Sequence, residues 1–328
     1  TPAELAAHHG WRRVLAVGAH PDDLDFGAAA TLAGFRAAGL HIELCIVTDG
    51  DAGGFDSEGP EAMTARRHAE QRAAAAVVGA AEVHFLGERD GHLEPDHGVR
   101  RKLVALMRRV RPDVVLSTHP ERDWERMQAA HPDHLACGEA VVRAAYPAVE
   151  NPYAYPELAA EGLEAFKIRN LLLYAAPAAR RNTVVDVTGL AEQKLRALDA
   201  HLSQHPDVDA MRRHVLAQMA EHHRHAAGPA AGPGHAAPVR GVHQVRDRHP
   251  EHGRGLGLVD LGLVDPRVDP GEYIAALHLL AFDKIDAVER ALHLGADGGR
   301  VDRRHRAQSF EHDRHIMLQD LCRRHRND

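Results

Sequence analysis

The sequence contains few cysteines and no long apolar run. Its 328 residues include Cys45, Cys137 and Cys322, which are odd in number and far apart. This pattern argues against a disulfide framework and against a metal site built from thiolates. No stretch approaches the ~18 apolar residues that a membrane-crossing helix requires, and residues 1–13 lack the pattern of an export signal. We therefore expect a soluble, cytoplasmic protein with no membrane span.

The charged residues form no concentrated patch of one sign along the chain. Forty basic and 47 acidic residues give a net charge of -7, and the basic residues are scattered, which makes nucleic acid a poor candidate partner. A hydrophobic fraction of 44% is enough for a substantial core. We predict one domain over residues 1–225 and, over residues 226–328, a C-terminal extension rich in His, Arg and Asp that lies outside the core. A homo-oligomer is compatible with the sequence.

Short apolar runs alternate with helical stretches along the first 225 residues. We predict strands at residues 14–18, 42–47, 83–86, 113–117, 171–174 and 183–187. Helices are predicted between them, at residues 63–78, 103–110, 135–145, 190–201 and 207–222. Apolar strands alternating with helices are typical of an α/β protein. The expected fold is Rossmann-like, with a mainly parallel sheet and helices on both faces.

Two clusters of His and Asp follow predicted strands. The cluster His20-Pro21-Asp22-Asp23 comes after the first strand, and His131-Pro132-Asp133-His134 lies in the long connection after the fourth. Catalytic groups of parallel α/β folds gather at the carboxyl ends of the strands, so the two clusters have a reason to meet. His119 also follows the fourth strand, but no carboxylate pattern accompanies it. We interpret His119 as a surface-loop histidine.

The residue types in these clusters suit a metal-dependent hydrolase. Zinc hydrolases generally use three nitrogen or oxygen ligands, and His20, Asp23 and His134 could supply them. Asp22 is then spare, and it could act as general base towards a metal-activated water. His131 is the candidate for a positively charged neighbour of the oxyanion. We predict Zn²⁺ as the cofactor, although the same ligands also admit other divalent metals such as Fe²⁺.

These clusters belong to an ordered series of motifs. The series comprises Ala19-His20-Pro21-Asp22-Asp23, Thr48-Asp49-Gly50, Arg67-His68-Ala69-Glu70, Phe85-Leu86-Gly87 with Asp90-Gly91, Arg111-Pro112-Asp113, His131-Pro132-Asp133-His134 and His201-Leu202-Ser203-Gln204. Over residues 12–205 it resembles the PIG-L/LmbE family of zinc-dependent N-deacetylases. The resemblance implies that His20, Asp23 and His134 bind zinc, that Asp22 is the general base and that His131 assists at the oxyanion or leaving group. It also implies that Arg67 and Asp90 contact the substrate sugar.

The function implied by the resemblance is hydrolysis of an acetyl or other acyl amide on an N-acetylglucosamine-type small molecule. Two alternatives remain open: a thiol-conjugate amidase of the mycothiol type, and a non-catalytic carbohydrate-binding protein with the same fold. The spare carboxylate of Asp22 argues against the second, because binding alone does not require it. Arg67 could instead form a helix-surface ion pair with Glu70. The chain departs from some family members at Ala129, where they carry a tyrosine.

Overall fold

The computed structural model describes residues 1–53, 59–124, 127, 130–227 and 258–264. The chain divides into two units, residues 1–282 and residues 283–328, and only the first contains described residues. No helix within the described ranges is both long and apolar enough to cross a membrane.

A seven-stranded, mostly parallel sheet forms the centre of the described structure, in the order β3-β2-β1-β4-β5-β7-β6. Its strands are β1 (Arg13–Gly18), β2 (His41–Thr48), β3 (Glu82–Glu88), β4 (Val114–Thr118), β5 (Asn170–Tyr174), β6 (Thr183–Asp186) and β7 (Leu258–Val264). Strands β1 to β5 pair in parallel, whereas β7 runs antiparallel to both β5 and β6. The predicted α/β fold with a mainly parallel sheet is confirmed.

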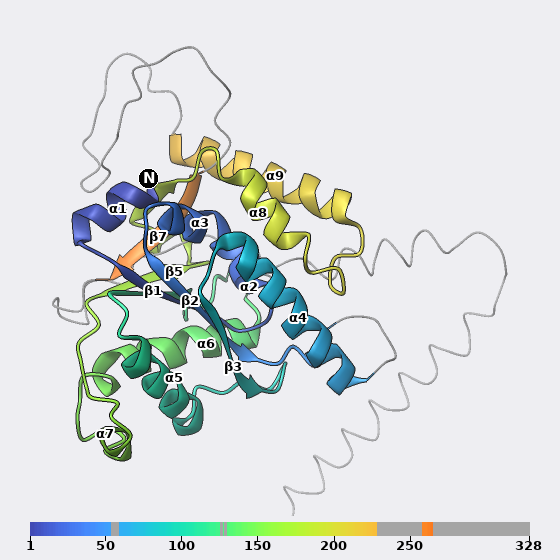
Figure 1. Ribbon diagram of the computed structural model, residues 1–328. Helices are drawn as coiled ribbons and strands as arrows, with labels where there is room; N and C mark the ends of the chain where they lie inside the picture. Colours follow the sequence, from blue (N-terminus) through green and yellow to red (C-terminus); the bar gives the residue numbers. More distant parts are fainter. Residues whose placement is uncertain (54–58, 125–126, 128–129, 228–257, 265–328) are drawn as a thin grey trace, which may run out of the picture. The chain divides into compact units, whose positions relative to one another are not determined.

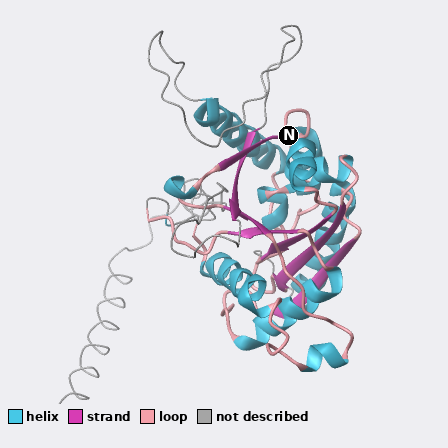
Figure 2. Ribbon diagram, turned by 90° about the vertical axis from the view of Figure 1, so that its left-hand side faces the viewer, coloured by secondary structure: helices cyan, strands magenta, loops and turns pink. Residues whose placement is uncertain are grey.

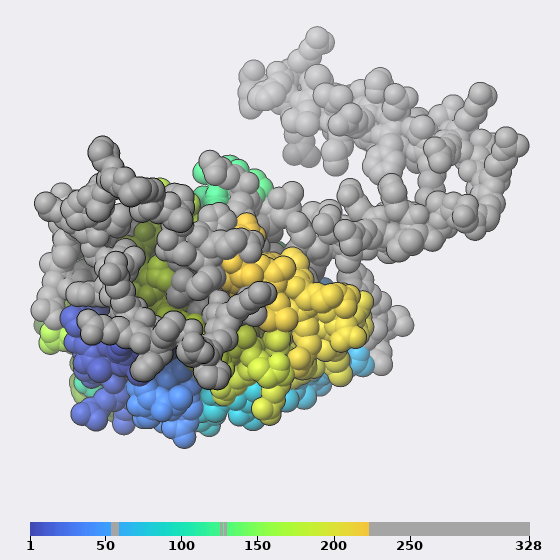
Figure 3. Space-filling view, turned by 90° about the horizontal axis from the view of Figure 1, so that it is seen from above, coloured from blue at the N-terminus to red at the C-terminus, as the bar shows by residue number. Residues whose placement is uncertain are grey.

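Helices cover both faces of this sheet (Figure 1). One face carries α1 (Pro2–His9), α3 (Ala29–Ala37), α4 (Pro60–Val78), α8 (Ala191–Leu198) and α9 (Val208–Ala227), and the other carries α5 (His97–Val110) and α6 (Pro132–Arg143). The shorter helices are α2 (Asp23–Gly27) and α7 (Glu157–Ala160), with single turns at Ala144–Ala148 and Ala178–Arg180. Figure 2 shows the strands between the helical layers, and Figure 3 shows α8 and α9 side by side on the surface.

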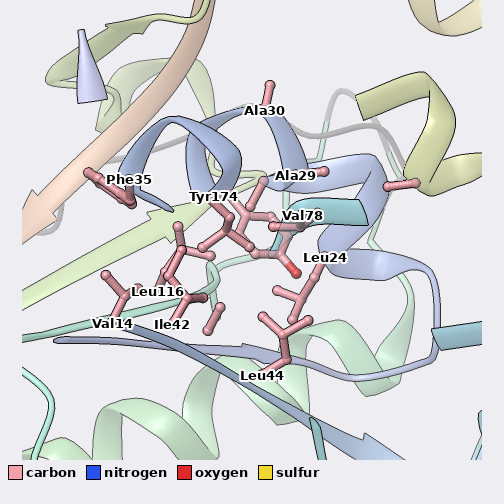
Figure 4. Packing of buried hydrophobic residues seen from close by; sticks show 14 of the residues in the cluster. Val14, Leu24, Ala29, Ala30, Phe35, Ile42, Leu44, Val78, Leu116 and Tyr174 are labelled. Atoms are coloured by element: carbon pink, nitrogen blue, oxygen red, sulfur yellow. The ribbon is translucent and has the colours of Figure 1, made fainter. Parts of the chain in front are cut away.

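The two-sided covering explains why the central strands are apolar at successive positions. In β1, Val14 and Ala16 belong to the core under α3, whereas Leu15 and Val17 belong to the core under α5 and α6. All four are fully buried, because alternate side chains of a strand point to opposite faces and both faces are covered. Figure 4 shows Val14 in the first of these cores, below Phe35 of α3.

The strand β7 was not predicted from the sequence. It lies within residues 226–328, yet it pairs with β5 and β6 of the sheet. The domain boundary after residue 225 stays a prediction, because most of the proposed extension lies outside the described residues.

Candidate active site

Loops that follow three strands, β1, β3 and β4, meet at the carboxyl edge of the sheet. His20 follows β1, Asp90 follows β3, and Asp133 begins the helix after β4. The Nε2 atom of His20 lies 3.1 Å from Oδ1 of Asp90 and 3.0 Å from Oδ2 of Asp133. The two His-Asp clusters therefore meet, as their positions after parallel strands predicted.

The first cluster is a tight turn between β1 and α2. The backbone N–H of His20 donates a hydrogen bond of 2.7 Å to Oδ2 of Asp23, which closes the turn. Asp22, between them, adopts φ 103° and ψ -29°, a left-handed conformation. Such a conformation costs a residue other than glycine roughly 1–3 kcal/mol. Although Asp22 precedes helix α2, its side chain makes no capping hydrogen bond, and the carboxylate remains available for other contacts.

The second cluster is the start of helix α6. His131 precedes the helix, Pro132 occupies its first position, and Nδ1 of His131 accepts a hydrogen bond of 3.2 Å from the N–H of Asp133. Proline suits this position because its missing N–H would have no partner there. The helix approaches β4 closely at Gly138, where a Cβ atom would lie 2.5 Å from the carbonyl oxygen of Thr118. The absence of a side chain at Gly138 therefore lets α6, which begins at the second cluster, pack directly against the end of β4.

The predicted metal ligands lie around Asp23. Its Oδ2 lies 3.4 Å from Nδ1 of His20, and its Oδ1 lies 3.0 Å from Nε2 of His134. Ring nitrogens of His20, His131 and His134 also lie within 4.8 Å of one another. Imidazole and carboxylate are the ligands that zinc and related divalent metals accept. These donor types fit a metal ion. His20, His131 and His134 form a compact set, and Asp23 lies beside His20 and His134.

Groups of opposite charge are in contact in this cluster. Burial raises the pKa of the Asp23 carboxyl, but interactions with His134 and His20 outweigh burial and hold the pKa well below its ordinary value. Burial lowers the pKa of His20, whereas Asp23, Asp133 and Asp90 raise it well above the ordinary value. A metal ligand must be deprotonated, so a cation bound here would compete with the proton on His20.

Asp22 lies beside a buried cation. Its Oδ1 is 3.4 Å from Nη2 of Arg67, and its Oδ2 is 3.7 Å from Nε2 of His205. Burial raises the pKa of the Asp22 carboxyl, but the charge of Arg67 and the nearby imidazole of His205 lower it to about 2. Asp22 is therefore ionised at neutral pH, the state that a proton acceptor requires.

Arg67 is almost fully buried, with 1% of its surface exposed. Its guanidinium donates 2.5 Å and 3.2 Å hydrogen bonds to the carbonyl oxygens of Pro21 and Gly50, and Nη1 lies 3.5 Å from Oδ2 of Asp90. The alternative of a surface ion pair with Glu70 is therefore wrong, because α4 turns Arg67 inward. Contact of Arg67 and Asp90 with a sugar stays a prediction.

His131 differs from the positively charged neighbour expected from the sequence. Burial lowers its pKa, and the charges of His20 and His134 lower it further. Because Nδ1 accepts the N–H of Asp133, a neutral His131 carries its proton on Nε2. His131 can therefore donate a hydrogen bond without a full positive charge.

Two further residues, His119 and Asp133, are buried near the site and differ from what the sequence predicted. His119 is not a surface histidine: only 1% of it is exposed, because the loop after β4 folds under α6. Asp133 was not predicted as a site residue, yet it is equally buried. Its carboxylate accepts the N–H groups of Gly91 and Leu93 and contacts His20. Its position between two predicted site histidines was the available signal. Ala129 lies outside the described residues.

A second group of ligand-type side chains lies elsewhere on β2 and β3. Glu43 and Glu82 flank His84, but Glu43 faces Nε2 at 2.7 Å whereas Glu82 faces Nδ1 at 3.7 Å. One atom from each of the three residues lies within 4.8 Å of the others, but Glu82 is exposed and His84 already forms a hydrogen bond with Glu43.

Comparison with known proteins identifies the family. The chain is 31% identical over 198 residues to a diacetylchitobiose deacetylase of Thermococcus kodakarensis, a match that covers 60% of this chain and 71% of that protein. The chain belongs to the PIG-L deacetylase family. The sequence profile of this family, described as GlcNAc-PI de-N-acetylase, matches residues 15–145. This range contains both His-Asp clusters.

Two further PIG-L relatives agree with this assignment. A 1D-myo-inositol 2-acetamido-2-deoxy-alpha-D-glucopyranoside deacetylase of Kineococcus radiotolerans is 29% identical over 266 residues, covering 62% of this chain and 72% of that protein. The solved structure of N,N'-diacetylchitobiose deacetylase from Pyrococcus horikoshii superposes with a TM-score of 0.62 at 26% identity, covering 68% of this chain and 82% of that one. The predictions of a PIG-L/LmbE-type fold and of a deacetylase acting on amide bonds are confirmed.

Proposed function

We propose that this protein is a zinc-dependent N-deacetylase of an N-acetylglucosamine-type sugar, in which Asp22 is the general base. The observation that supports the proposal is that His20, Asp23 and His134 lie together beside Asp22. The Asp22 carboxylate is not one of the three candidate metal ligands. Asp22 caps no helix and lies next to the candidate ligands in the same turn. A binding protein would have no use for this additional buried charge.

His20, Asp23 and His134 would hold the ion, with His131 as the alternative third ligand. When bound, Zn²⁺ lowers the pKa of water and polarises the amide carbonyl. The distances from Asp23 to both histidines support this donor set. The same ligands admit Fe²⁺, so the metal is a separate question from the activity.

The protein residues divide the proton transfers between them. Asp22 accepts a proton from the attacking water and returns it to the departing nitrogen, so that the net reaction converts amide and water into acetate and a primary amine. A pKa of about 2 makes Asp22 a weaker base than the ideal one, whose pKa lies near the working pH. Its contribution therefore depends on position and permanent ionisation. His131 donates a hydrogen bond from Nε2 to the developing oxyanion, as its tautomer allows.

The proposed substrate class follows the relatives. The names of two of them specify acetylated amino sugars, diacetylchitobiose in one and an inositol-linked 2-acetamido-2-deoxyglucose in the other. The shared part is the acetamido sugar, and the attached groups differ. We propose that Arg67 and Asp90 act at the sugar. Since Arg67 is buried against Asp90, we expect Asp90 to be the residue of this pair that makes the direct contact.

The test is primary-amine release from a panel of N-acetylglucosaminides, using wild-type protein and Asp22→Asn. Asp209→Asn, which changes an exposed carboxylate on α9, is the matched control. Metal content is measured for all three proteins. We expect amine release by wild type and Asp209→Asn, and a loss of at least ~100-fold in Asp22→Asn with metal retained.

The outcomes separate the alternatives. Amine release from mycothiol-type amides but not from simple acetamido sugars would favour the thiol-conjugate amidase. Binding of sugars by wild-type protein without amine release from any substrate would favour the non-catalytic reading. Equal activity of Asp22→Asn and wild type would refute Asp22 as general base.

A further inference from the structure

The left-handed turn at Asp22 is held by a chain of buried side chains that takes no part in the proposed chemistry. The backbone N–H of Asp22 donates a 2.9 Å hydrogen bond to Oε1 of Gln71, on helix α4. The amide of Gln71 donates in turn through Nε2, at 2.9 Å, to Oδ2 of Asp25. The same carboxylate oxygen lies 2.9 Å from Nε2 of His201, which follows α8. Two segments distant in sequence, α4 and the turn after α8, thus support one peptide group together with Asp25 of α2.

Each side chain in this series orients the one that follows it. The carboxylate of Asp25 accepts only, so it holds the NH₂ group of Gln71 towards itself and the carbonyl oxygen of Gln71 towards Asp22. Gln71 and His201 have no exposed surface and Asp25 has 1%, so water cannot substitute for a lost partner. On its other side, the carbonyl oxygen of Asp22 accepts the N–H groups of Asp25 and Phe26. The peptide groups on both sides of Asp22 are therefore held.

Helix α4 also holds the side chain of Asp22. Arg67 precedes Gln71 by four residues, which places both on the same face of the helix. Arg67 contacts Oδ1 of Asp22 and the carbonyl oxygen of Pro21, whereas Gln71 holds the N–H of Asp22. One helical face thus fixes both the main chain and the carboxylate of the proposed base.

We propose that Gln71 is a positioning residue, oriented by Asp25 and His201, which keeps Asp22 in the left-handed conformation that aims its carboxylate into the active site. A residue other than glycine does not adopt this conformation without support, and the relaxed turn would carry the carboxylate away from Arg67. The inference rests on the proposed role of Asp22 as proton acceptor. The three supporting side chains are buried, so they act on the active site through Asp22.

The first variant is Gln71→Met, which preserves length but removes the acceptor for the N–H of Asp22. We expect kcat to fall on the order of 10- to 100-fold, as for a misplacement of about 1 Å at a reacting group, while KM changes by less than about threefold and metal content stays unchanged. Gln193→Met is the matched control. It also removes one glutamine hydrogen bond, to the carbonyl oxygen of Val77, without contacting the turn. It should keep the wild-type kcat.

A charge exchange distinguishes positioning from simple loss of packing. Gln71→Glu alone puts a carboxylate against Asp25 and should lower kcat. In the double variant Gln71→Glu with Asp25→Asn, the introduced glutamate accepts hydrogen bonds from the N–H of Asp22 and from the introduced asparagine amide. The same amide also donates to Nε2 of His201, which then carries its proton on Nδ1. The double variant should therefore have a kcat at least tenfold higher than that of Gln71→Glu. A double variant no more active than Gln71→Glu would overturn the proposal.

A crystal structure of Gln71→Met supplies a readout that does not depend on activity. We expect φ of Asp22 to leave the positive region and its carboxylate to move away from Arg67. If wild-type protein releases no amine but Asp22 moves in Gln71→Met, the proposed function fails and the positioning role stands. If Asp22 keeps its conformation and kcat is unchanged, the positioning role is refuted while the deacetylase activity stands.

Discussion

The close approach of α6 to β4 at Gly138 makes the second cluster sensitive to a single methyl group. In Gly138→Ala, the new Cβ would lie 2.5 Å from the carbonyl oxygen of Thr118, 2.9 Å from the nitrogen of Pro120 and 3.0 Å from the carbonyl carbon of His119. All three are main-chain atoms, so no side chain can rotate away. An ordinary contact begins at 3.4 Å, so the helix must move away from the strand by roughly 1 Å.

Both stability and activity should respond to this displacement. Overpacking of this kind costs about 1–3 kcal/mol. The better helix propensity of alanine offsets about 1 kcal/mol of that cost. We therefore expect the free energy of unfolding to fall by up to about 2 kcal/mol. Since α6 carries His134, a shift of this size also separates it from Asp23, and kcat/KM should fall by on the order of 100-fold.

Urea unfolding, zinc titration and amine release together test this reasoning. Gly98→Ala in α5 is the matched control, because its new Cβ would meet only the side chain of Asp96, at 3.3 Å. That variant should be as stable as wild type or slightly more stable, with unchanged zinc affinity and activity. Wild-type stability and zinc affinity in Gly138→Ala would show that the contact with Thr118 does not set the position of α6.

Three further predictions concern pH, a buried arginine and the metal. Burial lowers the pKa of His119 from 6.5 to about 4, so the unfolded chain binds more protons between these values and stability falls as the pH drops. In His119→Asn, the Oδ1 of the introduced asparagine can still accept the N–H of Glu121. Between pH 7 and pH 5, this variant should lose about 2 kcal/mol less free energy of unfolding than wild type, as measured by urea unfolding. The same pH profile in both proteins would contradict the lowered pKa of His119. Arg108 is buried and donates hydrogen bonds to five carbonyl oxygens between residues 148 and 163. Arg108→Gln should therefore lower the free energy of unfolding by about 3 kcal/mol, whereas the exposed control Arg109→Gln should lower it by less than about 0.5 kcal/mol. Equal losses in the two variants would refute the structural role of Arg108. Zinc at 100 times its dissociation constant should raise the free energy of unfolding by about 3 kcal/mol, as measured by calorimetry. His134→Ala should abolish this increase. If the variant keeps the increase, His134 is not a ligand.

Much of the fold was predictable because its signals are local. The apolar runs at β1, β2 and β4 and the helical stretches between them stand in the sequence itself, and parallel pairing requires such an alternation. The strand β7 was missed because it lies in a segment without clear periodicity. Its pairing with β5 and β6 is a contact with residues more than 70 positions away.

The candidate site was predictable to the same extent. His20, Asp22 and Asp23 occupy one turn, and His131 and His134 occupy one helix start, so their spacing is already present in the chain. Their meeting followed from one rule, that the carboxyl ends of parallel strands share an edge. What the rule could not supply was the environment of each group.

The order of residues along the chain was enough to predict the candidate site residues and the strands that they follow. How those residues are held and charged depends on the three-dimensional packing around them. Arg67 is buried because α4 turns it inward, and His119 is buried because its loop folds under α6. The lowered pKa of His131 also depends on burial. The link from Asp25 to His201 spans 176 residues. Burial and such long-range contacts depend on what packs against a residue, and local sequence does not contain that information.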